Sequence, residues 1–280
     1  MAVTRTGAAA GTQPPQIHPT AVVDEAAELA DGVRIGPFAV IGADVRIGPR
    51  TTVGPHAVIE GPTTIGADNQ IYQFTSIGTD PQDLKYSGEP TRLEIGERNI
   101  IREFVTVNRG TPAGGGLTRI GDDCMLMAYA HVAHDCRVGD HVVFANCATL
   151  AGHVEIDDHA ILGGLVAVHQ HVRIGESAML GGGSMVSQDV PPFCIAVGDR
   201  ARLAGINVIG LRRRELPRTE ITELRSVYRT LFQTGKPLRE AIADVRESAD
   251  GRLSSKVEQL VAFVRTSERG VCRSGPSAES

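Results

Sequence analysis

Apolar residues recur at every sixth position along two thirds of the chain. The series starts at Ile17 and continues without exception to Ile77. It returns at Ile95 for three units and, after a loss of one residue of phase, runs from Ile120 to Val186, which makes 26 six-residue units. A period of six differs from the 3.6 residues of a helical turn and from the alternation of a simple strand. The pattern is typical of a parallel β-helix.

Each unit predicts a short flat strand followed by a corner, with its apolar residue facing a narrow core. Three units complete one triangular coil of 18 residues, so 26 units give nearly nine coils. At a strand spacing of about 4.8 Å the prism is roughly 40 Å long. The residue after the apolar position is often glycine, and we expect it to relieve backbone strain at the corner. The predicted fold class is therefore mainly β.

Two interruptions, 78–92 and 109–119, break the repeat. We expect both to leave the prism as loops, because a solenoid carries its insertions on one face. The first holds Asp83 and Lys85 in a stretch too irregular to form a coil. It is predicted to contact substrate.

Beyond the last unit the period changes to that of a helix. Apolar residues follow helical spacing after Pro217, and two more helices are predicted, from Pro237 to about Ser248 and from Ser255 through Val264. The predicted organisation is a disordered leader at 1–15, a β-helix domain at 16–199, a helical domain at 200–266 and a disordered tail at 267–280.

Composition agrees with a thin core. Glycine makes up 32 of 280 residues, aromatic residues only 4%, and there is no tryptophan. The five cysteines form no CxxC pair, which favours a reducing cytoplasm over a disulfide framework. No apolar run is long enough for a membrane span. The net charge is −5, yet from Arg200 onward 16 Lys and Arg face 10 Asp and Glu, which suggests an anionic partner for that part.

Histidines cluster in the later units. The units centred on 132, 150 and 168 share one face, so we expect His134, His153 and His169 to lie one above another, about 5 Å apart per coil. Beside Asp135 such a ladder is compatible with a zinc site or with acid–base chemistry. Cys136 adds a third possibility, a Cys–His nucleophile pair, although a free cysteine is more often a small core residue.

Several segments resemble one enzyme family closely. They are IYQFTSIG (71–78), QDLKYSGEPTRLEIGERN (82–99), RGTPAGGGLTRIG (109–121), AHVAHDC (130–136), ATLAGHVEIDD (148–158), AVHQ (167–170) and NVIGLRRR (207–214). Together they resemble the acyl-[acyl-carrier-protein]–UDP-N-acetylglucosamine O-acyltransferases over residues 16–266. The hexapeptide units alone would indicate only the wider acyltransferase superfamily.

The resemblance implies a left-handed β-helix and the first step of lipid A synthesis. A 3-hydroxyacyl group would move from acyl carrier protein to the 3-hydroxyl of UDP-N-acetylglucosamine, in a cytoplasmic homotrimer with active sites between subunits. It implies no cofactor, no metal, no nucleic acid and no membrane span. By resemblance, His134 is the general base, Asp135 orients it, and the Gly152 N–H faces the thioester oxygen.

The other implied positions surround the substrates. Residues matching those around the sugar, pyrophosphate and acyl chain are Asp83, Lys85, His131, His153, His169 and Gln170, and those matching the nucleotide-binding region are Asn207, Arg213 and Arg214. Gly182 matches the far end of the acyl groove, where a small residue goes with a longer chain. Ile209 and His171 depart from residues usual in relatives.

Elementary chemistry agrees with these roles. Neutral imidazole suits deprotonation of a sugar hydroxyl near neutral pH, and a backbone N–H stabilises a tetrahedral oxyanion. Alternatives are an acyltransferase for an amino-sugar analogue of the acceptor, the N-acyltransferase of the same pathway, a γ-type carbonic anhydrase holding zinc, and a solenoid that only binds. The N-acyltransferase carries a further N-terminal domain, and the carbonic anhydrase lacks the QDLKY loop.

Overall fold

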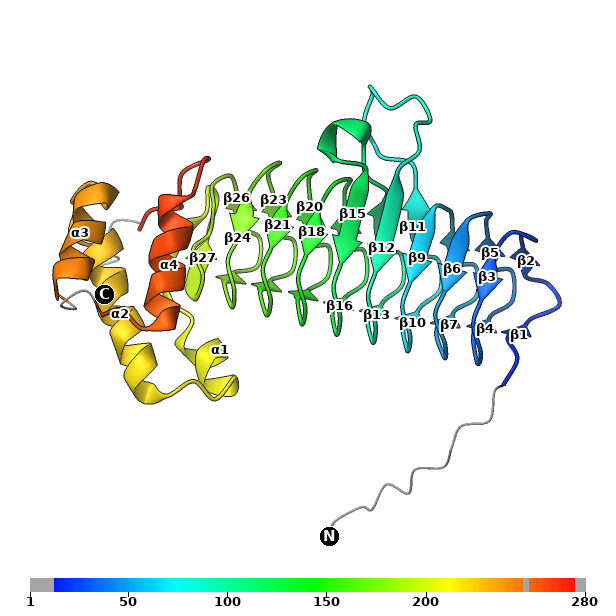
Figure 1. The fold of residues 1–280 in the computed structure, drawn as a ribbon, viewed down its shortest axis with the longest axis horizontal. Coiled ribbons are helices and arrows are strands. Elements are labelled where there is room, and N and C mark those ends of the chain that lie inside the picture. Colours follow the sequence, from blue (N-terminus) through cyan, green and yellow to red (C-terminus); the bar gives the residue numbers. More distant parts are fainter. Residues whose placement is uncertain (1–12, 249–251, 275–280) are drawn as a thin grey trace, which may run out of the picture.

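The computed structural model describes residues 13–248 and 252–274 of the chain. Short parallel strands form a three-sided prism, and helices cap its C-terminal end (Figure 1). Residues 1–12 of the predicted leader and 275–280 of the predicted tail lie outside the described residues.

Three sheets form the faces of the prism. Sheet A contains β1 (Gln16–Ile17), β4 (Arg34–Ile35), β7 (Thr52–Val53), β10 (Gln70–Ile71), β13 (Ile100–Ile101), β16 (Met125–Leu126), β19 (Val143–Phe144), β22 (Ile161–Leu162), β25 (Met179–Leu180), β27 (Cys194–Val197) and β28 (Arg202–Ile206). Sheet B contains β2 (Val22–Val23), β5 (Val40–Ile41), β8 (Val58–Ile59), β11 (Ser76–Thr79), β14 (Thr106–Asn108), β17 (His131–Val132), β20 (Thr149–Leu150), β23 (Ala167–Val168) and β26 (Met185–Val186). Sheet C contains β3 (Glu28–Leu29), β6 (Val45–Ile47), β9 (Thr63–Ile65), β12 (Arg92–Ile95), β15 (Leu117–Ile120), β18 (Arg137–Val138), β21 (Glu155–Ile156) and β24 (Arg173–Ile174).

The six-residue period is confirmed strand by strand. Each predicted unit supplies one of the strands β1–β26, and from Ile35 to Val186 its apolar residue is buried in the core. The register advances by 18 residues per coil, as in Gln16↔Arg34. It advances further only across the two interruptions, in Gln70↔Ile100 and Ile100↔Met125. The parallel pairing is kept on both sides of each interruption, so the loops leave the scaffold undisturbed.

The corners correct the expected role of glycine. At most corners the turning residue is the third after the apolar position, and it adopts a left-handed backbone without being glycine, as in Phe74 (φ 59°) and Asp135 (φ 60°). Glycine holds this position at two corners, as Gly32 and Gly183. Glycine occupies the first position for another reason. A Cβ on Gly48 would lie 2.6 Å from the carbonyl carbon of Gly66 in the next coil. Glycine is required there because successive coils approach closely, so the predicted relief of backbone strain was wrong for this position.

Helices and a returning segment close the C-terminal end. After the antiparallel pair β27–β28 come α1 (Val208–Arg213), α2 (Arg218–Phe232), α3 (Leu238–Ser248) and α4 (Ser255–Arg265). The helices begin at Val208, later than the predicted domain start, because the chain first forms β28. Within the described residues, no helix is both long and apolar enough to cross a membrane.

Residues 267–274 of the predicted disordered tail are ordered. Val271 pairs with Asp189 and Ser274 with Leu203 in isolated bridges. Val271 and Cys272 are buried. Two apolar residues in a small, polar segment make no periodic signal, so the sequence did not show that their backbone and side chains would dock on the prism.

Glu176 connects the helices to the prism and should make their docking sensitive to pH. Its carboxylate accepts hydrogen bonds from Arg214 (2.7 Å), Lys256 (3.0 Å) and Gln259 (2.8 Å). Burial raises the pKa of Glu176, but these hydrogen bonds outweigh burial and hold the pKa below its ordinary value. A lowered folded-state pKa stabilises the fold above the unfolded pKa, and this contribution is lost as the pH falls through the folded pKa.

We therefore expect Glu176→Gln to lower the free energy of unfolding by about 1–3 kcal/mol at pH 7, and by less as the pH falls below 4. Chemical denaturation followed by helical circular dichroism would measure this. The matched control is Glu155→Gln, which removes a carboxylate that is 53% exposed and lies 3.6 Å from Arg173. Its effect should stay within about 1 kcal/mol. Equal losses in both variants, or a loss independent of pH, would contradict the assignment.

Candidate functional site

Both loops that interrupt the repeat lie at the corner between sheets B and C. The first interruption leaves between β11 and β12 and the second between β14 and β15, and the next coil turns the same corner between β17 and β18. Both loops project from one edge of the prism in Figure 1. His134 lies in the turn after β17, so the loops and the histidine meet at one edge.

His134 and Asp135 form the centre of the site. The Nδ1 atom of His134 lies 2.8 Å from Oδ2 of Asp135, and the two side chains are 14% and 1% exposed. Because an ionised carboxylate only accepts hydrogen bonds, the pair places the imidazole proton on Nδ1. The lone pair of Nε2 is then available as a base.

Thr111, which the sequence analysis did not single out, holds this carboxylate. Its N–H donates to Oδ1 of Asp135 (2.9 Å) and its hydroxyl donates to Oδ2 (2.6 Å). The second interruption also packs glycine against the same group, since a Cβ on Gly114 would lie 2.0 Å from Cγ of Asp135. The glycine run in 109–119 signals a close approach, but the period does not reveal what is approached.

Gly152 lies against the ring of His134 in the next coil. A Cβ there would lie 2.4 Å from Cε1 of His134, so the ring position requires glycine. Throughout the described ranges, the Gly152 N–H donates to no protein acceptor. A free donor thus lies directly beside the base.

The neighbouring histidines are neutral at neutral pH. Nε2 of His153 lies 3.7 Å from Oδ2 of Asp135, and its ring meets that of His134 edge-on at 5.2 Å. Nδ1 of His131 lies 2.7 Å from the hydroxyl of Thr106. Burial lowers the pKa of His131, and the nearby His134 lowers it further. Burial is likewise the main cause that lowers the pKa of His153.

The predicted column of His134, His153 and His169 is wrong at His169. His134, His153 and His169 occupy different positions after their strands, so they do not form one column. His171 stacks on His153 instead, at 4.5 Å. His169 is exposed, with Nδ1 3.1 Å from the carbonyl oxygen of Gln170, and the exposed Gln170 amide lies 3.1 Å from Nε2 of His171.

Arg109 anchors the first interruption. It is 7% exposed and donates to the carbonyl of Gly78, to Asp80 and to the hydroxyl of Tyr86. The loop brings the charge of Asp83 close enough to His153 to favour protonation of that imidazole. Lys85 is exposed beside it, with its N–H donating to Asp83.

Four predicted site residues lie at other corners. Asn207, Arg213 and Arg214 belong to or cap α1 beside the corner between sheets C and A, and Gly182 lies at the corner between A and B. The Asn207 amide donates to the carbonyl of Ser177 and caps α1, while Arg214 pairs with Glu176. Arg213 is exposed and forms no ion pair in the part of the chain that the structure covers. Ile209 is also exposed on α1. One chain does not bring this region to His134.

The same cluster tests the two other chemistries. Ligand atoms of His134, Asp135 and His153 lie within 4.8 Å of one another, close enough for a metal ion. However, Oδ2 of Asp135 already accepts two hydrogen bonds, and a cation would have to displace one of them. Cys136 is fully buried, and burial raises the pKa of its thiol to about 12. The arrangement favours a hydrogen-bonded base over a metal centre or a thiolate.

Known proteins resemble the chain along nearly its whole length. The family profile described as UDP-N-acetylglucosamine O-acyltransferase, domain 2, matches residues 189–272, and the bacterial transferase hexapeptide profile matches 26–61 and 117–152. The solved UDP-N-acetylglucosamine acyltransferase of Francisella novicida is 39% identical, with a TM-score of 0.89 over 94% of this chain and 95% of that one. The enzyme of that name from Campylobacter jejuni is 40% identical, with a TM-score of 0.87 over 93% and 100%.

Sequence relatives are closer still. Two proteins named acyl-[acyl-carrier-protein]–UDP-N-acetylglucosamine O-acyltransferase, from Alkalilimnicola ehrlichii and Paraburkholderia xenovorans, are 55% and 54% identical to this chain. Both alignments cover 92% of this chain and 99% of the relative. With the same overall fold and this identity over nearly the whole length, the chain belongs to the acyl-[acyl-carrier-protein]–UDP-N-acetylglucosamine O-acyltransferase family.

Proposed function

We propose that the enzyme transfers a 3-hydroxyacyl group from acyl carrier protein to the 3-hydroxyl of UDP-N-acetylglucosamine, the first step of lipid A synthesis, with His134 as general base. The observation that carries the residue assignment is the chain of contacts from Thr111 through Asp135 to Nδ1 of His134, which leaves Nε2 free. Free cysteines in the described residues suit the cytoplasm, which we propose as the compartment.

The reaction needs one base and one oxyanion donor. Nε2 of His134 takes the proton of the sugar hydroxyl as its oxygen attacks the thioester carbon. The Gly152 N–H stabilises the negative charge that develops on the thioester oxygen. Collapse of the tetrahedral intermediate breaks the carbon–sulfur bond, and the departing thiolate takes the proton back from the imidazolium. Asp135 stabilises that imidazolium, and no covalent acyl-enzyme forms.

The remaining residues of this corner would hold the substrates. We assign Asp83 and Lys85, presented by the anchored first loop, to the sugar and its phosphates. His131 and His153, both neutral, supply hydrogen bonds to the sugar and the donor. We place His169 and Gln170 further along the same edge, beside the acyl group. A thioester is already activated, so this chemistry calls for neither cofactor nor metal.

Outward side chains indicate that sheets A and B pack against other copies. Those of sheet C are mostly charged: Glu28, Arg46, Thr64, Glu94, Arg119, Arg137, Glu155 and Arg173. Later strands of sheet A present Ile100, Met125, Val143, Ile161 and Met179, and early strands of sheet B present Val22, Val40 and Val58. Between these two faces, Phe38, His56, Phe74, Phe104 and Tyr129 stack at 4.7–5.2 Å along an exposed corner. A trimer with this aromatic corner near its axis would cover both faces and leave sheet C to solvent.

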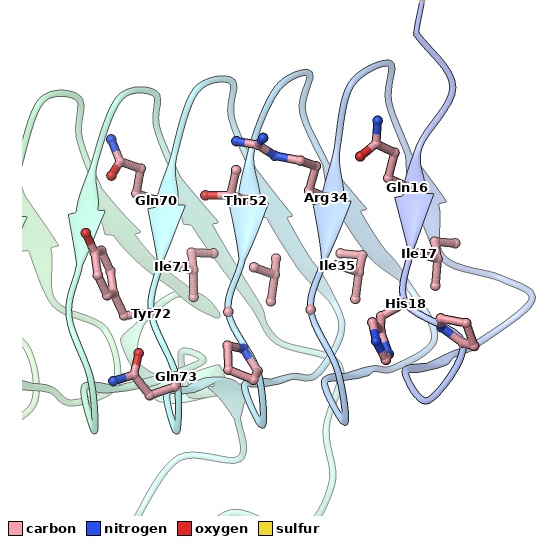
Figure 2. Close-up of a pocket in the computed structure, with 15 residues that line it drawn as sticks. Gln16, Ile17, His18, Arg34, Ile35, Thr52, Gln70, Ile71, Tyr72 and Gln73 are labelled. Carbon is pink, nitrogen blue, oxygen red and sulfur yellow. The ribbon is translucent and has the colours of Figure 1, made fainter.

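A hollow on sheet A fits this arrangement. It holds about 670 Å³ near the N-terminal end. Figure 2 shows it between the side chains of His18 and Tyr72, with Gln16, Arg34, Thr52 and Gln70 in a row along one side. The hollow exists because glycines, Gly36 and Gly54, occupy the equivalent positions in the two coils between. We propose that outward valines of sheet B from a second copy fill it.

Such a trimer would also complete the active site. If sheet B of one copy faces sheet A of the next, the corner with His134 lies beside the neighbour's corner between sheets C and A. That corner carries α1 with Arg213, which would bind the nucleotide phosphates. Each active site would then draw His134 from one subunit and Arg213 from another.

Mixed subunits test this proposal. His134→Ala and Arg213→Glu should each be nearly inactive in an assay with UDP-N-acetylglucosamine and 3-hydroxyacyl carrier proteins. Trimers reassembled from equal amounts of both should regain about a quarter of wild-type activity, because chance pairs two intact halves in that share of sites. Activity no greater than the sum of the two variants would place both residues in one subunit. Stoichiometric zinc bound through His134 would overturn the base mechanism.

Gly182 should set the length of the acyl chain. It is exposed, and a Cβ there would lie 3.3 Å from the carbonyl oxygen of Gly164, so a side chain needs a shift of a few tenths of an ångström and then extends away from the prism. We expect Gly182→Met to reduce kcat/KM for long 3-hydroxyacyl donors at least about 10-fold while retaining short ones. Donors of graded length in a competition assay measure this. The KM for UDP-N-acetylglucosamine is the internal control, and unchanged length selectivity would rule out the role.

A further inference from the structure

Three side chains stand in one column at the corner between sheets B and C. Asp135, His153 and His171 are each the third residue after β17, β20 or β23, and each turns the corner with a left-handed backbone (φ 60°, 60° and 62°). Oδ2 of Asp135 lies 3.7 Å from Nε2 of His153. The rings of His153 and His171 stack at 4.5 Å with 24° between their planes. His171 has no part in the reaction proposed above.

His171 contacts three residues of the site. Its N–H donates to the carbonyl oxygen of Gly152 at 3.2 Å, and its ring stacks on that of His153. Its Nε2 lies 3.1 Å from the side-chain amide nitrogen of Gln170. Because an amide nitrogen only donates, Nε2 of His171 accepts, and this contact exists only while Nε2 carries no proton. The ring of His171 is therefore held both through its backbone and through its side chain.

Four ionisable side chains face His153 from the surrounding elements. His134 and Asp135 belong to the turn after β17, Asp83 to the first loop and His171 to the turn after β23. Burial is the main cause that lowers the pKa of His153; Asp135 opposes it, and the neighbouring His171 lowers the pKa further. His171 therefore acts on His153 in two ways, because its ring excludes water and because a charge on it repels a second one.

A hollow of about 350 Å³ beside the two rings holds the other charged groups of this region. The Asp189 carboxylate accepts from the Arg173 N–H at 2.8 Å and from the Ser267 hydroxyl at 2.7 Å, and Glu155 lies 3.6 Å from the Arg173 guanidinium. The remaining charged residues of the lining are Glu268 and Arg269.

A proton on the stacked pair is drawn toward Asp135. Across the residues that the structure describes, Asp135 is the one carboxylate within 4.0 Å of His153, and none lies within that distance of His171. Its Oδ2 atom is also the acceptor for Nδ1 of His134. An imidazolium at His153 would compete with His134 for this oxygen, because a charged donor forms the stronger hydrogen bond. The general base therefore requires an uncharged His153.

We propose that His171 is a positioning residue for acyl transfer, whose ring holds His153 beside Asp135 and keeps it uncharged. This rests on the proposed function, because it concerns the same base and its carboxylate. His171 touches no reacting atom and takes no proton from the substrate. Its removal should reduce turnover mainly on the acid side of the pH profile, where His153 becomes protonated.

Two substitutions separate packing from charge. His171→Phe keeps a stacked ring and removes both nitrogens; phenylalanine already occupies an equivalent corner position, as in Phe74 (φ 59°). His171→Ala removes the ring as well. The matched control is Asp44→Ala, which places alanine on the same left-handed backbone (φ 56°) at the same corner in an early coil, where the side chain is exposed.

The titration of His153 can be followed without turnover. Imidazole NMR of the full-length enzyme labelled with ¹³C-histidine measures it, and His153→Gln assigns the signal. We expect the pKa of His153 to rise in His171→Phe, which loses the opposing charge, and to rise further in His171→Ala, where water also reaches the ring. The Asp44→Ala enzyme should titrate like wild type. A pKa of His153 that is unchanged or lowered in His171→Ala overturns the proposal.

The pH profile of acyl transfer gives the second readout. The ratio of kcat at about pH 6 to kcat at about pH 8 should fall at least about 3-fold in His171→Ala, less in His171→Phe and not at all in Asp44→Ala. In a His153→Gln background, His171→Ala should add no further pH dependence. A loss of equal size at every pH would assign only a packing role to His171 and overturn the proposal. If the wild-type enzyme transfers no acyl group, the proposed function fails, while the titration of His153 still decides whether His171 keeps it uncharged.

Discussion

His134→Ala should reduce the kcat of acyl transfer by about 10²- to 10⁴-fold, the usual contribution of a general base. The Nε2 atom of this histidine is the free basic nitrogen beside the free N–H of Gly152, and no other side chain of the cluster has its proton placed so firmly by a buried carboxylate. Steady-state assays at saturating donor and acceptor measure kcat directly. The variant should keep its fold, because the side chain turns outward from a corner and contributes nothing to the apolar core.

Two controls sharpen this result. Glu155→Gln changes an exposed side chain of sheet C, away from the corners that form the proposed site, and should leave kcat unchanged. Cys136→Ala should also remain active, because its thiol is buried and its pKa is raised to about 12. Near-normal turnover without His134 would exclude it as the base. Inactivity of a folded Cys136 variant would revive a covalent route.

Asp135→Asn should cost kcat nearly as much, about 10²-fold or more, with little change in size or shape. The two carboxylate oxygens accept from the Thr111 N–H, the Thr111 hydroxyl and His134. An amide nitrogen in either position turns one acceptor into a donor. If it faces His134, the imidazole proton moves to Nε2 and the base is lost.

Thr111 variants separate positioning from chemistry. Thr111→Val keeps the N–H contact and removes the hydroxyl, so we expect an intermediate loss of kcat, about 10-fold, with unchanged KM values. Thr111→Ser keeps both donors and should restore most of the activity. A Thr111→Val enzyme with normal kcat, or an Asp135→Asn enzyme with normal kcat, would show that the orientation of His134 does not limit the reaction.

Periodicity was a strong guide to the scaffold for a physical reason. Each six-residue unit meets the same core and the same neighbouring coils, so one short pattern predicted the strands β1–β26 and their stacking. The role predicted for glycine after the apolar position was wrong because a repeated glycine can signal either an unusual backbone angle or a close contact with the next coil. At Gly48 the cause is the contact. The ladder failed at His169 because a shift of one or two places after the strand sends a side chain to another part of the corner.

The sequence indicated the two central residues of the candidate site but not the residues that hold them in place. His134 and Asp135 are adjacent in sequence, so a local motif could indicate them. Thr111 and Arg109 act through contacts across loops that interrupt the repeat, and no local pattern encodes such contacts. Arg213 was indicated by resemblance, yet its place relative to His134 depends on how copies assemble.

The interruptions have a consequence for how this enzyme could be altered. Strands β9, β12 and β15 stay in parallel register although the first loop enters and leaves between them. The strand pairing of the scaffold therefore does not depend on the length of that loop. The entropic cost of closing a longer loop grows only slowly. Recognition of the acceptor could be exchanged as a cassette at this corner, while the column of coils beneath it folds as before.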